Sequence, residues 1–164
     1  MPFIIAYKDR EAWQLTAPLG RALVGSIRYL VGSGAPVTLV PVPSSPSAVR
    51  SRGFDHTATL ASWAAKQMGC RWAPLLARTG KVVDQVGQGT DGRMRNQAGS
   101  MTARPGNRCV VVVDDIVTSG ATAIEAVRAL VDAGHTVFGV ATIADTPLGH
   151  VRPSGRVGLG TTSR

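Results

Sequence analysis

The sequence VVVVDDIVTSGAT, residues 110–122, joins three patterns that together indicate one local structure. Its four valines are typical of a parallel strand that is buried on both faces. Two adjacent carboxylates, Asp114 and Asp115, come next, and the Thr-Ser-Gly turn after them leads into a stretch with helical spacing. We therefore expect a buried strand, a polar turn and a helix, with the reactive groups gathered at the turn.

The turn has the properties of a phosphate site. The first backbone N–H groups of a helix lack partners and carry a partial positive charge, which favours anions. Gly120 allows close approach to the backbone, and the neighbouring hydroxyls add hydrogen-bond donors. The predicted phosphate-binding residues are Thr118, Ser119, Gly120, Ala121 and Thr122.

Asp114 and Asp115 need a different role, because carboxylates repel a phosphate. They are suited to sugar hydroxyls, or to Mg²⁺ held through water. A phosphate cradle beside an acidic pair predicts a ribose 5-phosphate site. The plainest alternative is a buried strand followed by a capped helix. Acidic pairs also end strands in Walker B segments and receiver domains, but the sequence has neither a GxxxxGK[ST] stretch nor a receiver's early acidic pair and late lysine.

Apolar strands and helices alternate on both sides of this motif. We expect strands over residues 37–42, 72–77, 109–113 and 136–144, and helices over residues 11–31, 54–68 and 121–133. The alternation predicts an α/β fold: a single domain with a central, mostly parallel sheet flanked by helices. Such sheets bind ligands beyond the carboxyl ends of their strands, where we expect two loops, residues 43–53 and 114–122.

Two of the predicted helices show apolar faces that would pack on the sheet. In helix 54–68 the face consists of Leu60, Ala61, Ala64, Ala65 and Met68. In helix 121–133 the residues predicted to point inward are Ile124, Val127, Leu130 and Val131.

Residues 79–106 differ from the rest, with six glycines and little apolar periodicity. A loop of this length within a compact domain is usually functional or disordered, and we expect residues 85–99 to form a mobile lid. The organisation predicted for the whole chain is a strand and helix segment over residues 1–36, a core over 37–146 and a flexible tail over 147–164.

The composition is that of a basic globular domain, with a formal charge of +8 and a 44% hydrophobic content. No apolar run approaches the roughly 20 residues of a membrane span, and no secretory signal is evident, so we expect a soluble, cytoplasmic protein. The charge favours anionic partners such as a polyphosphate, nucleic acid or an acidic membrane surface. Weak binding of single-stranded nucleic acid stays open, although three Trp, two Tyr and three Phe offer few stacking platforms.

The two cysteines, Cys70 and Cys109, stand far apart in the sequence. No Cys-x-x-Cys pair is present, which excludes a zinc site made of cysteines. Cys109 opens the valine run, and we expect it to be a small buried hydrophobe.

Residues 110–122 resemble the phosphoribosyl pyrophosphate motif of type I phosphoribosyltransferases. Two further stretches are similar to the ComF branch of that family: PVPSSPSAVRSRGFD, residues 41–55, and QVGQGTDGRMRNQAG, residues 85–99. The resemblance runs from residue 5 to residue 145. Asp55 stands where that branch usually has Asn, and the cysteine-rich zinc segment of its longer members has no counterpart in this short form.

The resemblance implies that the protein binds phosphoribosyl pyrophosphate with Mg²⁺ and transfers the 5-phosphoribosyl group to an acceptor, with release of pyrophosphate. Asp114 and Asp115 would serve the ribose and a water-bound Mg²⁺, and Arg93 on the lid would meet the departing pyrophosphate. The residues implied for pyrophosphate binding are Pro43, Ser44, Ser45 and Arg52.

The sequence does not identify the acceptor of the phosphoribosyl group. It also leaves open whether the protein forms a homodimer. Two other functions are also compatible with the resemblance: a non-catalytic adaptor in DNA uptake, suggested by the link of ComF proteins to competence, and a sensor that binds phosphoribosyl pyrophosphate without turnover. We assign no catalytic role to His56 or His135, because an isolated histidine is more often structural.

Overall fold

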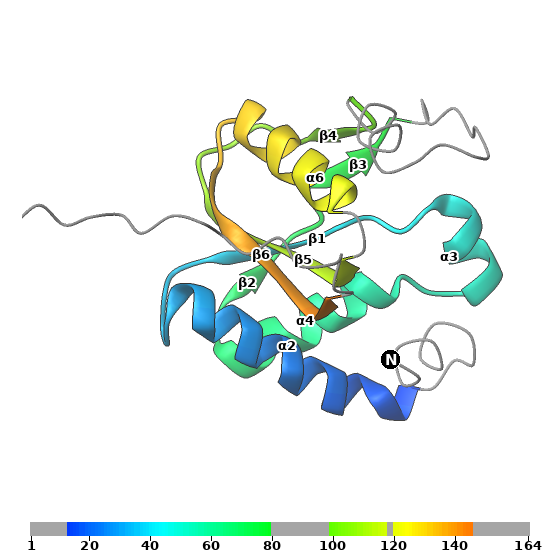
Figure 1. Cartoon of the computed structure of the whole chain (residues 1–164), viewed down its shortest axis with the longest axis vertical. Coiled ribbons are helices and arrows are strands. Elements are labelled where there is room, and N and C mark those ends of the chain that lie inside the picture. Colours follow the sequence, from blue (N-terminus) through cyan, green and yellow to red (C-terminus); the bar gives the residue numbers. More distant parts are fainter. Residues whose placement is uncertain (1–12, 80–98, 118–119, 146–164) are drawn as a thin grey trace, which may run out of the picture.

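The computed structural model describes residues 13–79, 99–117 and 120–145. Four parallel strands form a central sheet in the order β2-β1-β5-β6 (Figure 1). These strands are β1 (Thr38–Pro41), β2 (Arg71–Trp72), β5 (Cys109–Val117) and β6 (Thr136–Asp145). The predicted α/β fold with a central parallel sheet is confirmed.

Helices cover both faces of the sheet. On one face lie α2 (Thr16–Val31), which follows the short 3-10 helix η1 (Trp13–Leu15), and α4 (His56–Met68). On the other face lies α6 (Ala121–Asp132). In the described part of the chain, no helix is long and apolar enough to cross a membrane.

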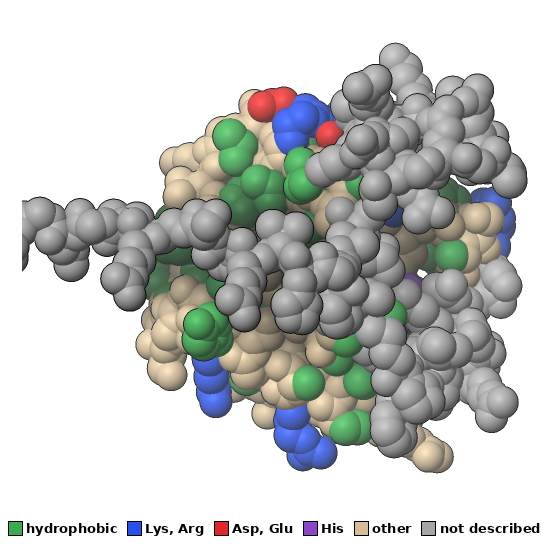
Figure 2. All heavy atoms as spheres, viewed as in Figure 1, with side chains coloured by type: hydrophobic (Ala, Val, Ile, Leu, Met, Phe, Trp, Pro, Cys, Tyr) green, Lys and Arg blue, Asp and Glu red, His purple; other side chains and the backbone are tan. Residues whose placement is uncertain are grey.

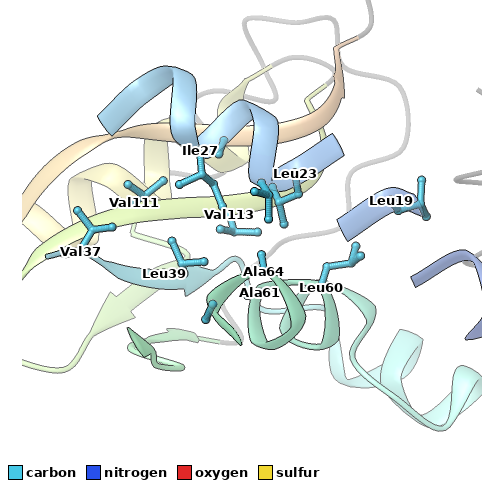
Figure 3. Close-up of a cluster of buried hydrophobic side chains, with 13 residues drawn as sticks. Leu19, Leu23, Ile27, Val37, Leu39, Leu60, Ala61, Ala64, Val111 and Val113 are labelled. Atoms are coloured by element: carbon cyan, nitrogen blue, oxygen red, sulfur yellow. The ribbon is translucent and has the colours of Figure 1, made fainter. Parts of the chain in front are cut away.

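The valine run connects two hydrophobic clusters, because successive residues of a strand point to opposite faces. Val111 and Val113 pack with α2 and α4, in the cluster shown in Figure 3. Val110 and Val112 pack with Ala126, Ala129 and Leu130 of α6. All four valines are fully buried, which is the reason the run is continuously apolar rather than alternating.

The register of β1 and β5 brings their carboxyl ends together. Pro41 of β1 pairs with Val113 of β5, and the N–H of Val42 donates to the carbonyl of Val113 at 2.9 Å. The chain leaves β1 at this point toward residues 43–55, and β5 continues into the two acids. The loop after β1 therefore starts beside the two acids. The second loop, expected from residue 114, was placed too early, because β5 stays paired with β6 as far as Val117.

The loop expected over residues 43–53 contains a helix, α3 (Pro46–Arg52), which we did not predict. Ser45 is its N-cap and accepts a hydrogen bond from the N–H of Ala48, while Pro46 occupies the first turn. Gly53 ends the helix in the left-handed conformation, with φ of 77°. A capping serine followed by proline is a helix-start signal, so this helix could have been predicted from the sequence.

The single strand expected over residues 72–77 is wrong. The structure has two short strands there, β2 and β3 (Leu76–Arg78), which belong to different sheets. Pro74 lies between them and has no N–H for a ladder. β3 pairs antiparallel with β4 (Met101–Ala103), a strand inside the segment that we expected to be one long loop.

The predicted inner face of α6 is also partly wrong. Leu130 is buried as expected, but Ile124 and Val131 are 57% and 54% exposed. Alanines of α6 pack against the valines of β5 instead, and their small side chains let the helix lie close to the sheet. Hydrophobic side chains consequently gather on the outer surface over α6 and β6 (Figure 2).

The cysteines lie at the amino end of the sheet. Cys109 is exposed rather than buried, since it is the first residue of β5, and Cys70 is half-buried just before β2. Burial raises the pKa of the Cys70 thiol. Both cysteines are free thiols.

Candidate active site

Asp115 is held by the protein on both of its carboxylate oxygens. Its Oδ2 lies 2.9 Å from Nε2 of His56, and its Oδ1 accepts a hydrogen bond of 2.8 Å from the N–H of Ile116. Asp115 and His56 are each 5% exposed. A carboxylate can only accept hydrogen bonds, so Nε2 of His56 carries the proton.

Asp114 has a different environment although it is the adjacent residue. It is half-buried, and its Oδ1 accepts the N–H of Asp115 at 2.9 Å. The alternation of the strand continues that of the valines, so Asp115 lies on the α4 side of the sheet and Asp114 on the α6 side. From the sequence we expected the two acids to share one role, whereas the structure gives them different neighbours.

The loop after β1 is fixed at three consecutive residues. The carbonyl of Pro43 accepts a hydrogen bond from Nε of Arg78 at 2.9 Å. The Oγ of Ser44 donates to Oδ1 of Asp55 at 3.1 Å. Ser45 caps α3, as described above. This anchoring gives the loop a defined shape at the carboxyl end of the sheet.

A cavity of about 220 Å³ lies between this loop and the tip of β5. Its walls include Pro43, Ser44 and Ser45 from the loop, both acids from β5, and Thr122 from α6. These residues come from three separate stretches of sequence. The structure thus brings three of the residues predicted for pyrophosphate, both acids predicted for ribose, and Thr122 of those predicted for phosphate to one cavity. Gly120 and Ala121 do not line it.

Gly120 lines a separate cavity with Ile124 and Val127, whereas the start of α6 reaches the cavity beside the acids at Thr122. Gly120 is the N-cap of α6, in the left-handed conformation with φ of 73°, and its carbonyl accepts the N–H of Ile124 at 2.9 Å. The first turn contains no acidic residue, which leaves its partial positive charge available to an anion.

Several predicted residues lie outside the part of the chain that is described. They are Thr118, Ser119 and Arg93. Residues 85–98 of the predicted lid also lie outside the described residues. Arg52 belongs to α3, but its side chain is not described.

Arg78 and His56 line the cavity, and neither was given a role from the sequence. The place of Arg78 depends on the pairing of β3 with β4. His56 was taken as structural, and it does contact Asp115. His135 is structural, as expected, since its ring nitrogens bond the backbone of Arg104 and Arg108.

The donor set suits Mg²⁺ only if other ligands join it. No group of three or more His, Cys, Asp or Glu side chains that could hold a metal ion occurs among the described residues. Mg²⁺ commonly binds through one or two carboxylates together with water and substrate phosphates. The acidic tip of β5 fits that arrangement and not an all-protein cage.

Known proteins resemble this chain in sequence and in fold. Residues 56–157 match the model of the phosphoribosyl transferase domain. A stretch of 41 residues is 56% identical to orotate phosphoribosyltransferase from Bacillus caldolyticus, covering 25% of this chain and 19% of that protein.

Solved structures share the fold at low identity. An adenine phosphoribosyltransferase superposes with a TM-score of 0.51 at 19% identity, over 81% of this chain and 71% of its own. The allosteric regulatory enzyme of purine biosynthesis superposes with a TM-score of 0.50 at 21% identity, over 80% of this chain and 26% of its own. Since the family model covers more than half of its residues, this chain belongs to the phosphoribosyl transferase domain family.

Proposed function

We propose that the protein binds phosphoribosyl pyrophosphate with Mg²⁺ and transfers the 5-phosphoribosyl group to an acceptor, with release of pyrophosphate. One observation carries this proposal: a single cavity collects the loop after β1, the acidic tip of β5 and the start of α6. The membership of the family supports it.

We assign the three parts of the substrate to three sets of residues around the cavity. The 5-phosphate lies on Thr118 to Thr122, where the amino end of α6 attracts it. The ribose hydroxyls donate to Asp114, which is half-buried and lines the cavity. The pyrophosphate lies along Pro43, Ser44 and Ser45, with Arg52 and the lid residue Arg93 as counter-charges.

The reaction needs little covalent chemistry from the side chains of the protein. As pyrophosphate leaves C1 of the ribose, positive charge develops on the sugar ring, and the Asp114 carboxylate beside the ring stabilises that charge. Asp115 is buried and keeps the tip of β5 in shape. When bound, Mg²⁺ would neutralise charge on the departing pyrophosphate, and the Asp114 and Asp115 carboxylates would hold it through water.

We further propose that the chain belongs to the ComF branch of the family and works in the cytoplasm. The stretches at residues 41–55 and 85–99 support this branch, since they carry the PVP and RGF segments and the spaced Gln, Arg, Asn and Gly. No acceptor is assigned.

Ligand-induced stabilisation tests the proposed function. With Mg²⁺ and phosphoribosyl pyrophosphate about 100-fold above Kd, we expect roughly 2.7 kcal/mol of stabilisation, which shifts the melting temperature by roughly 5–10 °C for a domain near this size. Release of pyrophosphate in the presence of a panel of nucleobases and amines would then identify the acceptor. The absence of any melting shift at millimolar ligand would refute the proposal.

A further inference from the structure

Two consecutive residues at the start of α4, Asp55 and His56, contact opposite walls of the cavity. Asp55 accepts hydrogen bonds from Ser44 in the loop after β1, at 3.1 Å from Oγ and 3.4 Å from the N–H. His56 donates to Asp115 at the tip of β5. The first turn of one helix therefore touches both segments that form the cavity.

The contact of His56 with Asp115 is well shielded. The side chains of His56 and Asp115 are 6% and 7% exposed, and the two residues are 59 positions apart in the sequence. A hydrogen bond between an N–H and a carboxylate is among the stronger ones in proteins, and water competes little for it when it is buried. His56 thus fixes the orientation of the Asp115 carboxylate.

The contact of Asp55 with Ser44 is tied to the helix itself. The same Oδ1 that accepts the Ser44 hydroxyl also accepts the N–H groups of Thr57 and Ala58, both at 3.1 Å. Asp55 is therefore the N-cap of α4 and the anchor of the loop at once. The loop cannot shift relative to α4 without disturbing this cap.

We propose that Asp55 and His56 form a positioning pair that sets the spacing between the pyrophosphate-binding loop and the tip of β5, where Asp115 holds the strand in shape beside the ribose-binding Asp114. This inference rests on the proposed function, because it assigns those two parts of the substrate to the two walls. Neither residue needs to touch the substrate. The pair acts through Ser44 and Asp115, and it matters most for a ligand that occupies both walls together.

Phosphoribosyl pyrophosphate spans both walls, whereas ribose 5-phosphate reaches only the acids and the start of α6. The ratio of the two affinities therefore measures how well the walls are aligned. Calorimetric titration of both ligands in Mg²⁺ buffer gives that ratio for each variant. It does not require the acceptor to be known.

His56→Leu removes the N–H that donates to Asp115 and replaces the imidazole with an apolar side chain of similar bulk. We expect it to lower the preference for phosphoribosyl pyrophosphate over ribose 5-phosphate by about tenfold or more, the effect of losing a hydrogen bond to a charged group. His56→Gln should restore most of the preference, because the glutamine amide can place an N–H near the position of Nε2.

Asp55→Ser tests the positioning pair a second time without changing the buried histidine. Serine is as good an N-cap as aspartate, but its side chain is too short to hold Ser44 as well. We expect the same loss of preference with little loss of stability. The double variant should lose less than the product of the two single effects, because contacts that act as one unit are not additive.

His135→Leu is the matched control. His135 is also a 5% exposed histidine, but its hydrogen bonds go to the backbone of Arg104 and Arg108 at the other end of the sheet. This variant should lose stability and keep the ligand preference of the unchanged protein.

The outcomes separate the two proposals. If the unchanged protein binds neither ligand, the proposed function fails. If it binds both, and His56→Leu and Asp55→Ser keep its preference, the positioning pair is wrong. A His56→Leu protein that does not fold leaves Asp55→Ser and His56→Gln to decide, and an unaltered preference in Asp55→Ser then overturns the inference.

Discussion

The Oε1 atom of Glu125 accepts a hydrogen bond from the N–H of Met101 at 3.0 Å, which joins α6 to strand β4. Arg128 completes the contact, because it donates to both oxygens of Glu125 and to the carbonyl of Met101. Glu125 is only 3% exposed. A buried, fully paired carboxylate of this kind holds the β3–β4 hairpin, and with it Arg78, against the rest of the domain.

Acid should weaken this contact and destabilise the fold. The hydrogen bond from Arg128 lowers the pKa of Glu125 from its ordinary value of 4.5. The stabilisation is therefore complete above the ordinary pKa, and it declines as the pH falls through the lower pKa of the folded protein. Melting temperatures between pH 7 and pH 3 would show this loss.

Glu125→Gln is the control for that measurement. It should lower the free energy of unfolding by about 1–3 kcal/mol at pH 7, the cost of impairing a buried charged hydrogen bond. It should also flatten the dependence on pH in the acid range. An equally steep dependence in the variant would assign the acid sensitivity to another carboxylate.

Asp114→Asn should impair the ligand and spare the fold. The side chain is half-buried and lines the cavity, so an uncharged amide is tolerated there. We expect the affinity for phosphoribosyl pyrophosphate to fall by about tenfold or more, and the affinity for inorganic phosphate to stay nearly unchanged. Titrations of both ligands check this, and equal losses for both would mean that the acid only shapes the loop.

Asp115→Asn should affect stability as well as binding. Both carboxylate oxygens of Asp115 accept hydrogen bonds within the protein, and the amide group of asparagine would oppose one of those donors. The free energy of unfolding should fall by about 1–3 kcal/mol, measured by denaturant titration. A variant as stable as the unchanged protein would contradict the structural role of this residue.

Gly120→Ala should weaken phosphate binding through the backbone alone. A Cβ at this position would meet no atom within 4 Å, but φ is 73°, and the left-handed conformation costs other residues about 1–2 kcal/mol. Gly69→Ala is the matched control, since Gly69 has φ of 66°, open space around it, and a place at the end of α4. Both variants should lose similar stability, and only Gly120→Ala should lose affinity for phosphate. Comparable phosphate affinity in the two would remove Gly120 from the site.

Single-stranded DNA should bind weakly and with strong dependence on salt. The formal charge of +8 supplies attraction, but the chain has few aromatic residues for stacking. Raising the salt from about 50 mM to 200 mM should lower the affinity by about tenfold or more, measured by fluorescence anisotropy. Tight binding that survives about 0.3 M salt would favour the adaptor function over the transferase.

The features predicted correctly from the sequence depend on local signals. The valine run, the acidic pair and the glycine before α6 stand close together in the sequence, so the strand and the helix could be recognised from thirteen residues. The turn predicted between them includes residues 118 and 119, which lie outside the described residues. The parallel sheet followed from the alternation of strands and helices. Burial of Leu60, Ala61, Ala64 and Ala65 in α4 also agrees with the helical spacing.

The features that were missed depend on contacts between distant segments. Arg78 reaches Pro43 only because β3 pairs with β4 across residues 80–98. His56 meets Asp115 through the packing of α4 on the sheet, and nothing local to either residue indicates the partner. The inner face of α6 was misjudged because hydrophobicity alone ranks Ile124 above Ala123, whereas close packing on the valines favours the smaller side chain.

The positions of the two cysteines make site-selective labelling practical. Cys109 begins β5, and Asp114 lies five residues further along the strand, so about 16 Å separates a dye attached there from the acids. Cys109 is exposed, whereas Cys70 is half-buried and burial raises the pKa of its thiol. Since the thiolate is the reactive form, a maleimide fluorophore should modify Cys109 first and give a uniformly labelled protein with its substrate cavity unobstructed.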